Sequence, residues 1–203
     1  DVNASAARWA VEHDWDCVIV TSDRDAFAHI SDHTRVLRLI DGGIHGSPLL
    51  TPARLHAMYG VAAEHYLDYA ALRGDASDNL PGVTGIGEKT AAALLETVGS
   101  MQAVWSDIEY DEGRSVIAAL DDWSLELGGR RIGASVVRRL AAPGARDRYD
   151  FNVRVMSGVD DLDLGLTLDV PGSPGLLPLE PDRVARAVGF FNVQATTDLA
   201  MRV

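Results

Sequence analysis

The chain has 203 residues, of which 47% are hydrophobic, and its formal net charge is -12 at pH 7. This length can bury one sizeable core or two small ones. The single cysteine, Cys17, excludes a disulfide framework and favours a reducing compartment, and no apolar run approaches the roughly 20 residues that span a bilayer. We therefore expect a soluble, intracellular protein that does not bind membranes.

The first part of the chain has the pattern of an α/β layer. Apolar residues at helical spacing predict a helix over residues 3–13. The runs CVIV (17–20) and TRVLRLI (34–40) predict two strands, with one or two helical turns at 26–31 between them. Residues 41–48 predict a loop or hairpin tip. Because a sheet normally has about four to six strands, this stretch is expected to be part of a larger sheet.

The remainder is predicted to be largely helical. Thr51 and Pro52 are typical of a helix start, and Gly60 of its end. Further helices are predicted over about 62–73, over 88–98, from there through Trp105, and over about 113–140. Residues 141–182 are rich in Pro, Gly and Asp, with weak apolar alternation at 162–168, and a short helix is predicted at 181–190.

Two pairs of aspartates are candidate site residues. Asp23 and Asp25 directly follow the first predicted strand, at the edge where open α/β sheets bind ligands. Asp75 and Asp78 stand three apart in RGDASDN. Each has an ordinary alternative, because Asp25 could cap a helix, Asp23 could form an Asx-turn, and Asp75 and Asp78 could be solvated acids or turn caps.

The chemistry of these acids favours a metal site. Mg²⁺ and Mn²⁺ prefer oxygen ligands, and they bind through a few carboxylates together with water and substrate phosphate. A pair of such ions can activate a water molecule and stabilise the leaving oxygen of a phosphodiester. Carboxylates neutralised in this way can face a phosphate, so the net negative charge of the chain does not exclude a nucleic-acid substrate.

A glycine-rich turn follows the second acidic pair. PGVTGIGEKTAAALL has the form of a helix–hairpin–helix element, in which Gly85 and Gly87 allow close approach to a phosphate and positive φ. The next helix points its free N–H groups and positive dipole end at the same place, where Lys89 and Thr90 add a charge and a hydroxyl. The alternative is a plain turn between two helices.

With these motifs in place, the chain resembles the 5′-nuclease family of bacteria and phages, which includes flap endonucleases and the 5′→3′ exonuclease domain of DNA polymerase I. The resemblance is strongest at 17–39 and 66–99. It implies a PIN-like α/β nuclease core, of which 1–45 would be the remainder. It also implies a helical region at 46–140 with a helix–three-turn–helix, and a C-terminal segment at 141–203 that packs back on the core.

The resemblance also implies roles for single residues. Asp23 and Asp25 match the family's T-x-D-x-D motif, and Asp75 and Asp78 match its G-D-x-x-D-N motif, so these four acids would be catalytic metal ligands for two or more Mg²⁺ or Mn²⁺ ions. Asp1 matches the last residue of the family's E-A-D-D motif, whose other acids would lie in an upstream portion.

The same resemblance extends to the glycine-rich turn. There the carbonyl groups of Val83 and Ile86 would hold K⁺, while Gly85, Gly87, Lys89 and Thr90 would contact DNA.

The function expected from this resemblance is metal-dependent hydrolysis at a 5′ flap or 5′ end of duplex DNA, in replication and repair. Such a protein would act as a monomer in the bacterial cytoplasm, either alone or as a domain of DNA polymerase I. Two other functions remain open. One is a duplex-DNA-binding module without activity, in which Arg130, Arg131, Arg138 and Arg139 either bind DNA or form a solvated helix face. The other is a PIN-like ribonuclease.

Overall fold

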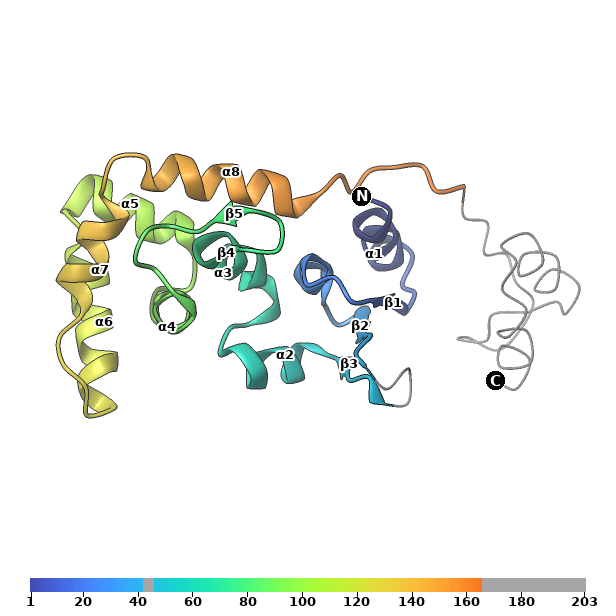
Figure 1. The fold of residues 1–203 in the computed structure, drawn as a ribbon, viewed down its shortest axis with the longest axis horizontal. Coiled ribbons are helices and arrows are strands. Elements are labelled where there is room, and N and C mark those ends of the chain that lie inside the picture. The colour runs from blue at the N-terminus through green and yellow to red at the C-terminus, as the bar shows by residue number, and fades with distance from the viewer. Residues whose placement is uncertain (42–45, 166–203) are drawn as a thin grey trace, which may run out of the picture. The chain divides into compact units, whose positions relative to one another are not determined.

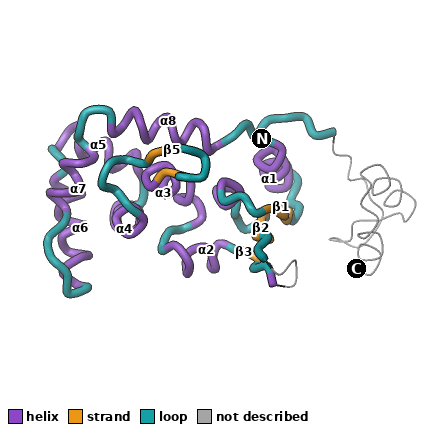
Figure 2. The backbone as a smooth tube through the Cα atoms, in the orientation of Figure 1, coloured by secondary structure: helices purple, strands orange, loops and turns teal. Residues whose placement is uncertain are grey.

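The computed structural model describes residues 1–41 and 46–165, and it is a mixed α/β structure, mostly helical with small sheets (Figure 2). Residues Asp1–Leu164 form one compact unit. The helix predicted at 181–190 and most of the segment at 141–203 lie outside the described residues. Within the described ranges, no helix is long and apolar enough to cross a membrane.

The α/β layer matches its prediction closely. Helix α1 (Val2–Glu12), strand β1 (Cys17–Thr21), a 3₁₀ helix η1 (Asp25–His29) and strand β2 (Thr34–Arg38) follow in the expected order. Strand β1 pairs parallel to β2, and β2 pairs antiparallel to a short strand β3 (Leu49–Leu50). Because side chains alternate across a strand, Ile19, Val36 and Leu50 share one buried face of this sheet.

The first helix after the sheet begins and ends as its sequence predicts, whereas the next is divided. Helix α2 (Pro52–Tyr59) starts at Thr51, whose hydroxyl accepts a hydrogen bond from the Arg54 N–H group, and it ends at Gly60 with φ of 71°. The helix predicted at 62–73 is divided into a 3₁₀ helix η3 (Ala63–His65) and helix α3 (Tyr66–Arg73). Rings of Phe27, Tyr59, Tyr66 and Tyr69 pack together and join η1, α2 and α3.

The later helices differ from their predicted lengths. Helix α4 (Glu88–Val98) is as expected, whereas α5 (Met101–Asp111) extends beyond Trp105. The region 113–140 contains two helices, α6 (Arg114–Glu126) and α7 (Gly133–Leu140). After the break, the buried Asp121 carboxylate caps the start of α7, because it accepts hydrogen bonds at 2.8 Å from the N–H groups of Ile132 and Gly133.

Helix α8 (Ala145–Ser157) corrects the prediction for residues 141–182, in which no helix was expected before 181. Its buried residues, Ala145, Tyr149, Asn152 and Met156, recur at intervals of three and four. Two of them are polar or amphipathic, so an apolar periodicity is not visible in the sequence. The weak alternation predicted from residue 162 forms no strand over the described residues 162–165.

A close backbone crossing encloses the loop that carries the second acidic pair. Strand β4 (Gly74–Asp75) pairs antiparallel with β5 (Leu80–Pro81), an element the sequence did not predict. Gly74 has φ of +78°, and a Cβ atom there would overlap the Gly82 backbone. Figure 1 shows α8 running along α3, β4 and β5. From α8, the Asn152 side-chain amide donates to the carbonyls of Ala71 and Pro81, at 2.9 and 3.0 Å.

We expect Asn152→Ala to lower the free energy of unfolding by roughly 2–3 kcal/mol, because the buried carbonyl of Ala71 and the partly buried carbonyl of Pro81 lose their donor. Chemical denaturation followed by circular dichroism measures the change. The matched control is Asn3→Ala, on the exposed face of α1, which should change stability by no more than about 0.5 kcal/mol. Equal losses of stability in the two variants would show that the hydrogen bonds of Asn152 do not hold this loop in place.

Candidate active site

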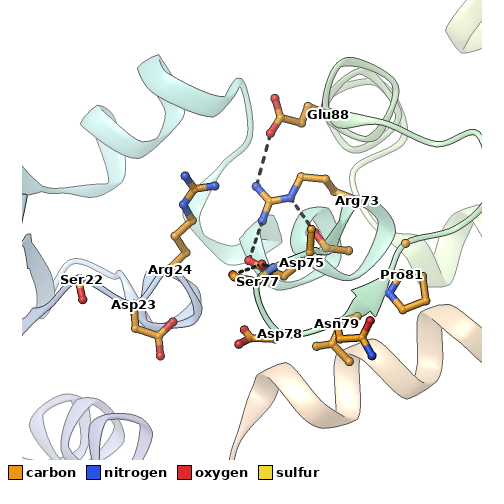
Figure 3. Close-up of a pocket in the computed structure, with 14 residues that line it drawn as sticks. Ser22, Asp23, Arg24, Arg73, Asp75, Ser77, Asp78, Asn79, Pro81 and Glu88 are labelled. Carbon is orange, nitrogen blue, oxygen red and sulfur yellow. Dashed lines mark hydrogen bonds and ion pairs between the residues drawn. The ribbon is translucent and has the colours of Figure 1, made fainter.

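Three of the four acids in the two predicted pairs, Asp23, Asp75 and Asp78, line one cavity of about 930 Å³, whereas Asp25 is not among its lining residues. Its walls are the turn after β1, at residues 22–24, the end of α3 with the loop 73–82, and Glu88 at the start of α4. Figure 3 shows the carboxylates of Asp23 and Asp78 pointing toward one another across this cavity. Segments about 50 residues apart in the sequence therefore meet at the edge where β1 ends, which is where an open α/β sheet binds ligands.

The first pair is arranged by a tight turn. The Asp23 N–H group donates to the Thr21 hydroxyl, and the Asp25 N–H group donates to the Asp23 carboxylate, both at 3.0 Å. Asp23 therefore forms the Asx-turn weighed as its ordinary role, and its second carboxylate oxygen makes no hydrogen bond among the described residues. The Asp25 side chain does not cap η1, so helix capping does not explain that residue.

The second pair is held by the loop between β4 and β5. One carboxylate oxygen of Asp75 accepts hydrogen bonds from both the hydroxyl and the N–H group of Ser77. These bonds from Ser77, with the hydroxyl foremost, lower the pKa of Asp75, and the nearby Arg73 and Arg24 act in the same direction. Asp78 is exposed in the same loop. Asp75 is therefore ionised and fixed, and Asp78 is free to bind a ligand.

The charges of the two pairs act on one another. Burial is the largest cause that raises the pKa of Asp25 to about 6, followed by the charges of Asp23, Asp78 and Asp75, while Arg73 opposes the rise. A carboxylate that is destabilised by three others is one that a divalent cation would stabilise. The donor set, four aspartates from two segments, therefore suits a hard cation such as Mg²⁺ or Mn²⁺.

The carboxylates converge without closing around one point. Among the described residues, no three Asp, Glu, His or Cys side chains are near enough to one another to hold a single ion. Asp1, the fifth predicted ligand, does not line the cavity. Its carboxylate accepts a hydrogen bond at 2.8 Å from the Val159 N–H group, where the chain leaves α8. The structure thus brings Asp23, Asp75 and Asp78 to one cavity and places Asp25 near enough for their charges to act on it.

The glycine-rich turn lies between β5 and α4. Ile86 donates its N–H group to the Val83 carbonyl at 2.9 Å, and both side chains are buried. Gly85 has φ of +79°, as predicted, whereas Gly87 has φ of -102° and precedes α4 in an extended conformation, so positive φ is wrong for Gly87. No atom lies within 4 Å of the position where Gly87 would carry a Cβ, so the backbone is open to an external group there.

Two arginines outside the acidic motifs and the glycine-rich motif lie at the turn and at the cavity. Arg139, on α7, donates from its guanidinium to the Gly85 carbonyl at 2.8 Å, and a Cβ at Gly85 would lie 2.9 Å from the Arg139 side chain. Arg73, at the end of α3, lies in the wall of the cavity. Only the position of Arg73 directly before the G-D-x-x-D-N motif could have suggested it, and no local signal marks Arg139 over Arg138.

Comparisons with known proteins agree with the motifs. A family model described as 5′-3′ exonuclease, C-terminal SAM fold, matches residues 61–128. The chain is 43% identical over 105 residues to DNA polymerase I of Deinococcus radiodurans, covering 52% of this chain and 10% of that protein. It is 34% identical over 172 residues to the thermostable DNA polymerase I of Thermus filiformis, covering 83% of this chain and 20% of that protein.

A solved structure of the T5 D15 protein, co-crystallised with metal ions, matches with a TM-score of 0.45 and 18% identity, over 76% of this chain and 59% of that one. In sequence, the chain spans a fifth or less of the length of the two polymerases that it matches. The resemblance that the motifs predict is confirmed by the family match over residues 61–128 and by the similarity to the two polymerases.

Proposed function

We propose that the protein is a metal-dependent 5′ nuclease that hydrolyses duplex DNA at a 5′ flap or a 5′ end. One observation carries the proposal: Asp23, Asp75 and Asp78 from two separate segments line a single cavity, and burial together with the charges of these three acids raises the pKa of Asp25. Such mutual repulsion destabilises the metal-free site and would be relieved by divalent cations, as a phosphodiesterase of this kind requires.

Asp23, Asp25, Asp75 and Asp78 would hold two or more Mg²⁺ or Mn²⁺ ions. Ions at such a site activate water as a nucleophile and stabilise the leaving oxygen of a phosphodiester. The contribution of the chain itself is positional, because the Asx-turn fixes Asp23 and the Ser77 hydrogen bonds fix Asp75. Hydrolysis would leave the phosphate on the 5′ end of the downstream product.

The turn at 82–87 would be the central part of a helix–three-turn–helix that binds the duplex. The open space beside Gly87 and the free N–H groups at the start of α4 support contact with a phosphate. Lys89 and Thr90 follow in the first turn of α4, and the carbonyls of Val83 and Ile86 would hold K⁺. A monomer that works on replicating and damaged DNA in the bacterial cytoplasm is the simplest biological setting.

A duplex-binding role without cleavage is the second candidate, and the hydrogen bond from Arg139 to Gly85 supports the binding that it requires. This contact places one arginine of α7 beside the proposed phosphate site. It distinguishes Arg139 from Arg138, which is exposed on the same helix and has no hydrogen bond or ion pair among the described residues.

We expect Asp25→Asn to lower the rate of Mn²⁺-dependent cleavage of a 5′-labelled flap duplex by roughly 10²-fold or more while leaving duplex affinity within about threefold. The reason is that the change removes a metal-binding charge and leaves the turn at 82–87 intact. Asp32→Asn, an exposed acid outside the cavity, is the control and should cleave like the unaltered protein. Equal losses of cleavage and binding would count against the proposal.

The raised pKa of Asp25 predicts a pH-dependent effect of metal on stability. In the metal-free protein the folded chain keeps this proton up to about pH 6, whereas the unfolded chain loses it near about pH 4, so this contribution to stability declines across that window as pH rises. Millimolar Mg²⁺ should therefore raise the melting temperature at about pH 7.5 and leave it nearly unchanged at about pH 4. An equal shift at both pH values would show that Mg²⁺ acts elsewhere.

We expect Arg139→Ala to weaken duplex binding and to reduce the slope of log affinity against log salt concentration by about 1, because one cation near a phosphate is lost. Fluorescence anisotropy with a labelled duplex over a range of KCl concentrations measures both quantities. Arg138→Ala makes the same change of charge on the same helix and should leave the slope unchanged. If the two variants have the same affinity and the same salt slope, both arginines belong to a solvated helix face and neither binds DNA.

A further inference from the structure

Arg73 is a cation whose side chain is held in place in the wall of the cavity that Asp23, Asp75 and Asp78 line. Its side chain is only 11% exposed. The Nε–H group donates to the Gly74 carbonyl at 3.0 Å, and the guanidinium carbon lies 5.4 Å from the centroid of the Tyr69 ring. A backbone hydrogen bond and a cation–π contact therefore fix the plane of the guanidinium.

The terminal nitrogens are not satisfied by the acids around them. Nη2 lies 3.7 Å from an Asp75 oxygen, and Nη1 lies 3.7 Å from a Glu88 oxygen, and both distances are too long for hydrogen bonds. Nη1 is buried and has no hydrogen-bond partner among the described residues. Figure 3 shows the guanidinium between Asp75 and Glu88.

A neutralising role for Arg73 does not account for this geometry. An arginine that serves only as a counter-ion usually forms short, often bidentate, hydrogen bonds to its carboxylate. Here Asp75 takes its hydrogen bonds from Ser77 instead, and Glu88 is largely exposed to solvent. A guanidinium withdrawn from water with unused donors is costly unless a ligand supplies the acceptors.

We propose that Arg73 binds the non-bridging oxygens of the phosphate that is cleaved, which rests on the nuclease function proposed above. A guanidinium carries two parallel donors whose spacing matches two phosphate oxygens, and it stays charged at every working pH. In this arrangement Asp23 and Asp78 face one another across the cavity, while Arg73 lies in the cavity wall on the α3 side. Arg73 thereby becomes a substrate-binding residue of the site.

The test compares the affinity of product duplexes that end in a 5′-phosphate or a 5′-hydroxyl. Affinities are measured in Ca²⁺ by anisotropy, and each duplex is checked afterwards on a gel for cleavage. We expect the unaltered protein to prefer the 5′-phosphate by roughly tenfold or more, and Arg73→Met to reduce this preference to about twofold or less. Arg73→Lys keeps the positive charge but lacks the two parallel donors of the guanidinium. It should give an intermediate ratio of the two affinities.

Arg54→Met is the matched control, because it removes one arginine charge from the exposed face of α2, outside the cavity. It should keep the full preference for the 5′-phosphate. The proposal is overturned if Arg73→Met keeps that preference, or if Arg54→Met loses it equally. Circular dichroism verifies folding, and if Arg73→Met does not fold, the Arg73→Lys ratio decides the question by itself.

Cleavage of a labelled flap duplex by the unaltered protein separates this proposal from the nuclease function. Cleavage together with an Arg73-independent phosphate preference would refute only the role of Arg73. A phosphate preference that depends on Arg73, without any cleavage, would support the role of Arg73 and refute the nuclease.

Discussion

The candidate site depends on the clamp that Asn152 forms across the loop 74–82. One amide on α8 donates to the last turn of α3 and to β5, so both ends of the loop that carries Asp75 and Asp78 are fixed to the same buried side chain. Between these ends Gly74 and Gly82 cross without room for a Cβ. A loop held this rigidly can present two carboxylates at a fixed distance from the turn after β1, which is the condition for a shared metal site.

Repulsion among carboxylates is the cost of this arrangement. Burial and three neighbouring acids oppose the ionisation of Asp25, and within the described residues Arg73 is the cation in the cavity wall that moderates that effect. The net charge of the whole chain therefore says little about its ligand, because the local requirement is a cluster of negative charge that cations neutralise. The turn at 82–87 and Arg139 lie just beyond the same loop, so the clamp also orients the surface that we propose for the duplex.

Much of this could be predicted from local patterns. The strand followed by TSDRD, the N-cap at Thr51 and the left-handed Gly85 each follow from a few neighbouring residues. Helix α8 could not be predicted, because its central buried residue is Asn152 and its role appears only when Ala71 and Pro81 are beside it. The contacts of Arg139 and the unused donors of Arg73 are likewise tertiary, since the first joins residues 54 positions apart.

The most direct test of the central claim is a crystal structure of the protein soaked with Mn²⁺, with the ions located by their anomalous scattering. We predict manganese in the cavity, bound by oxygens of Asp23, Asp75 and Asp78, with Asp25 nearby. Manganese bound elsewhere, or a cavity without manganese at saturating concentration, would contradict the claim that the two acidic pairs form one metal site.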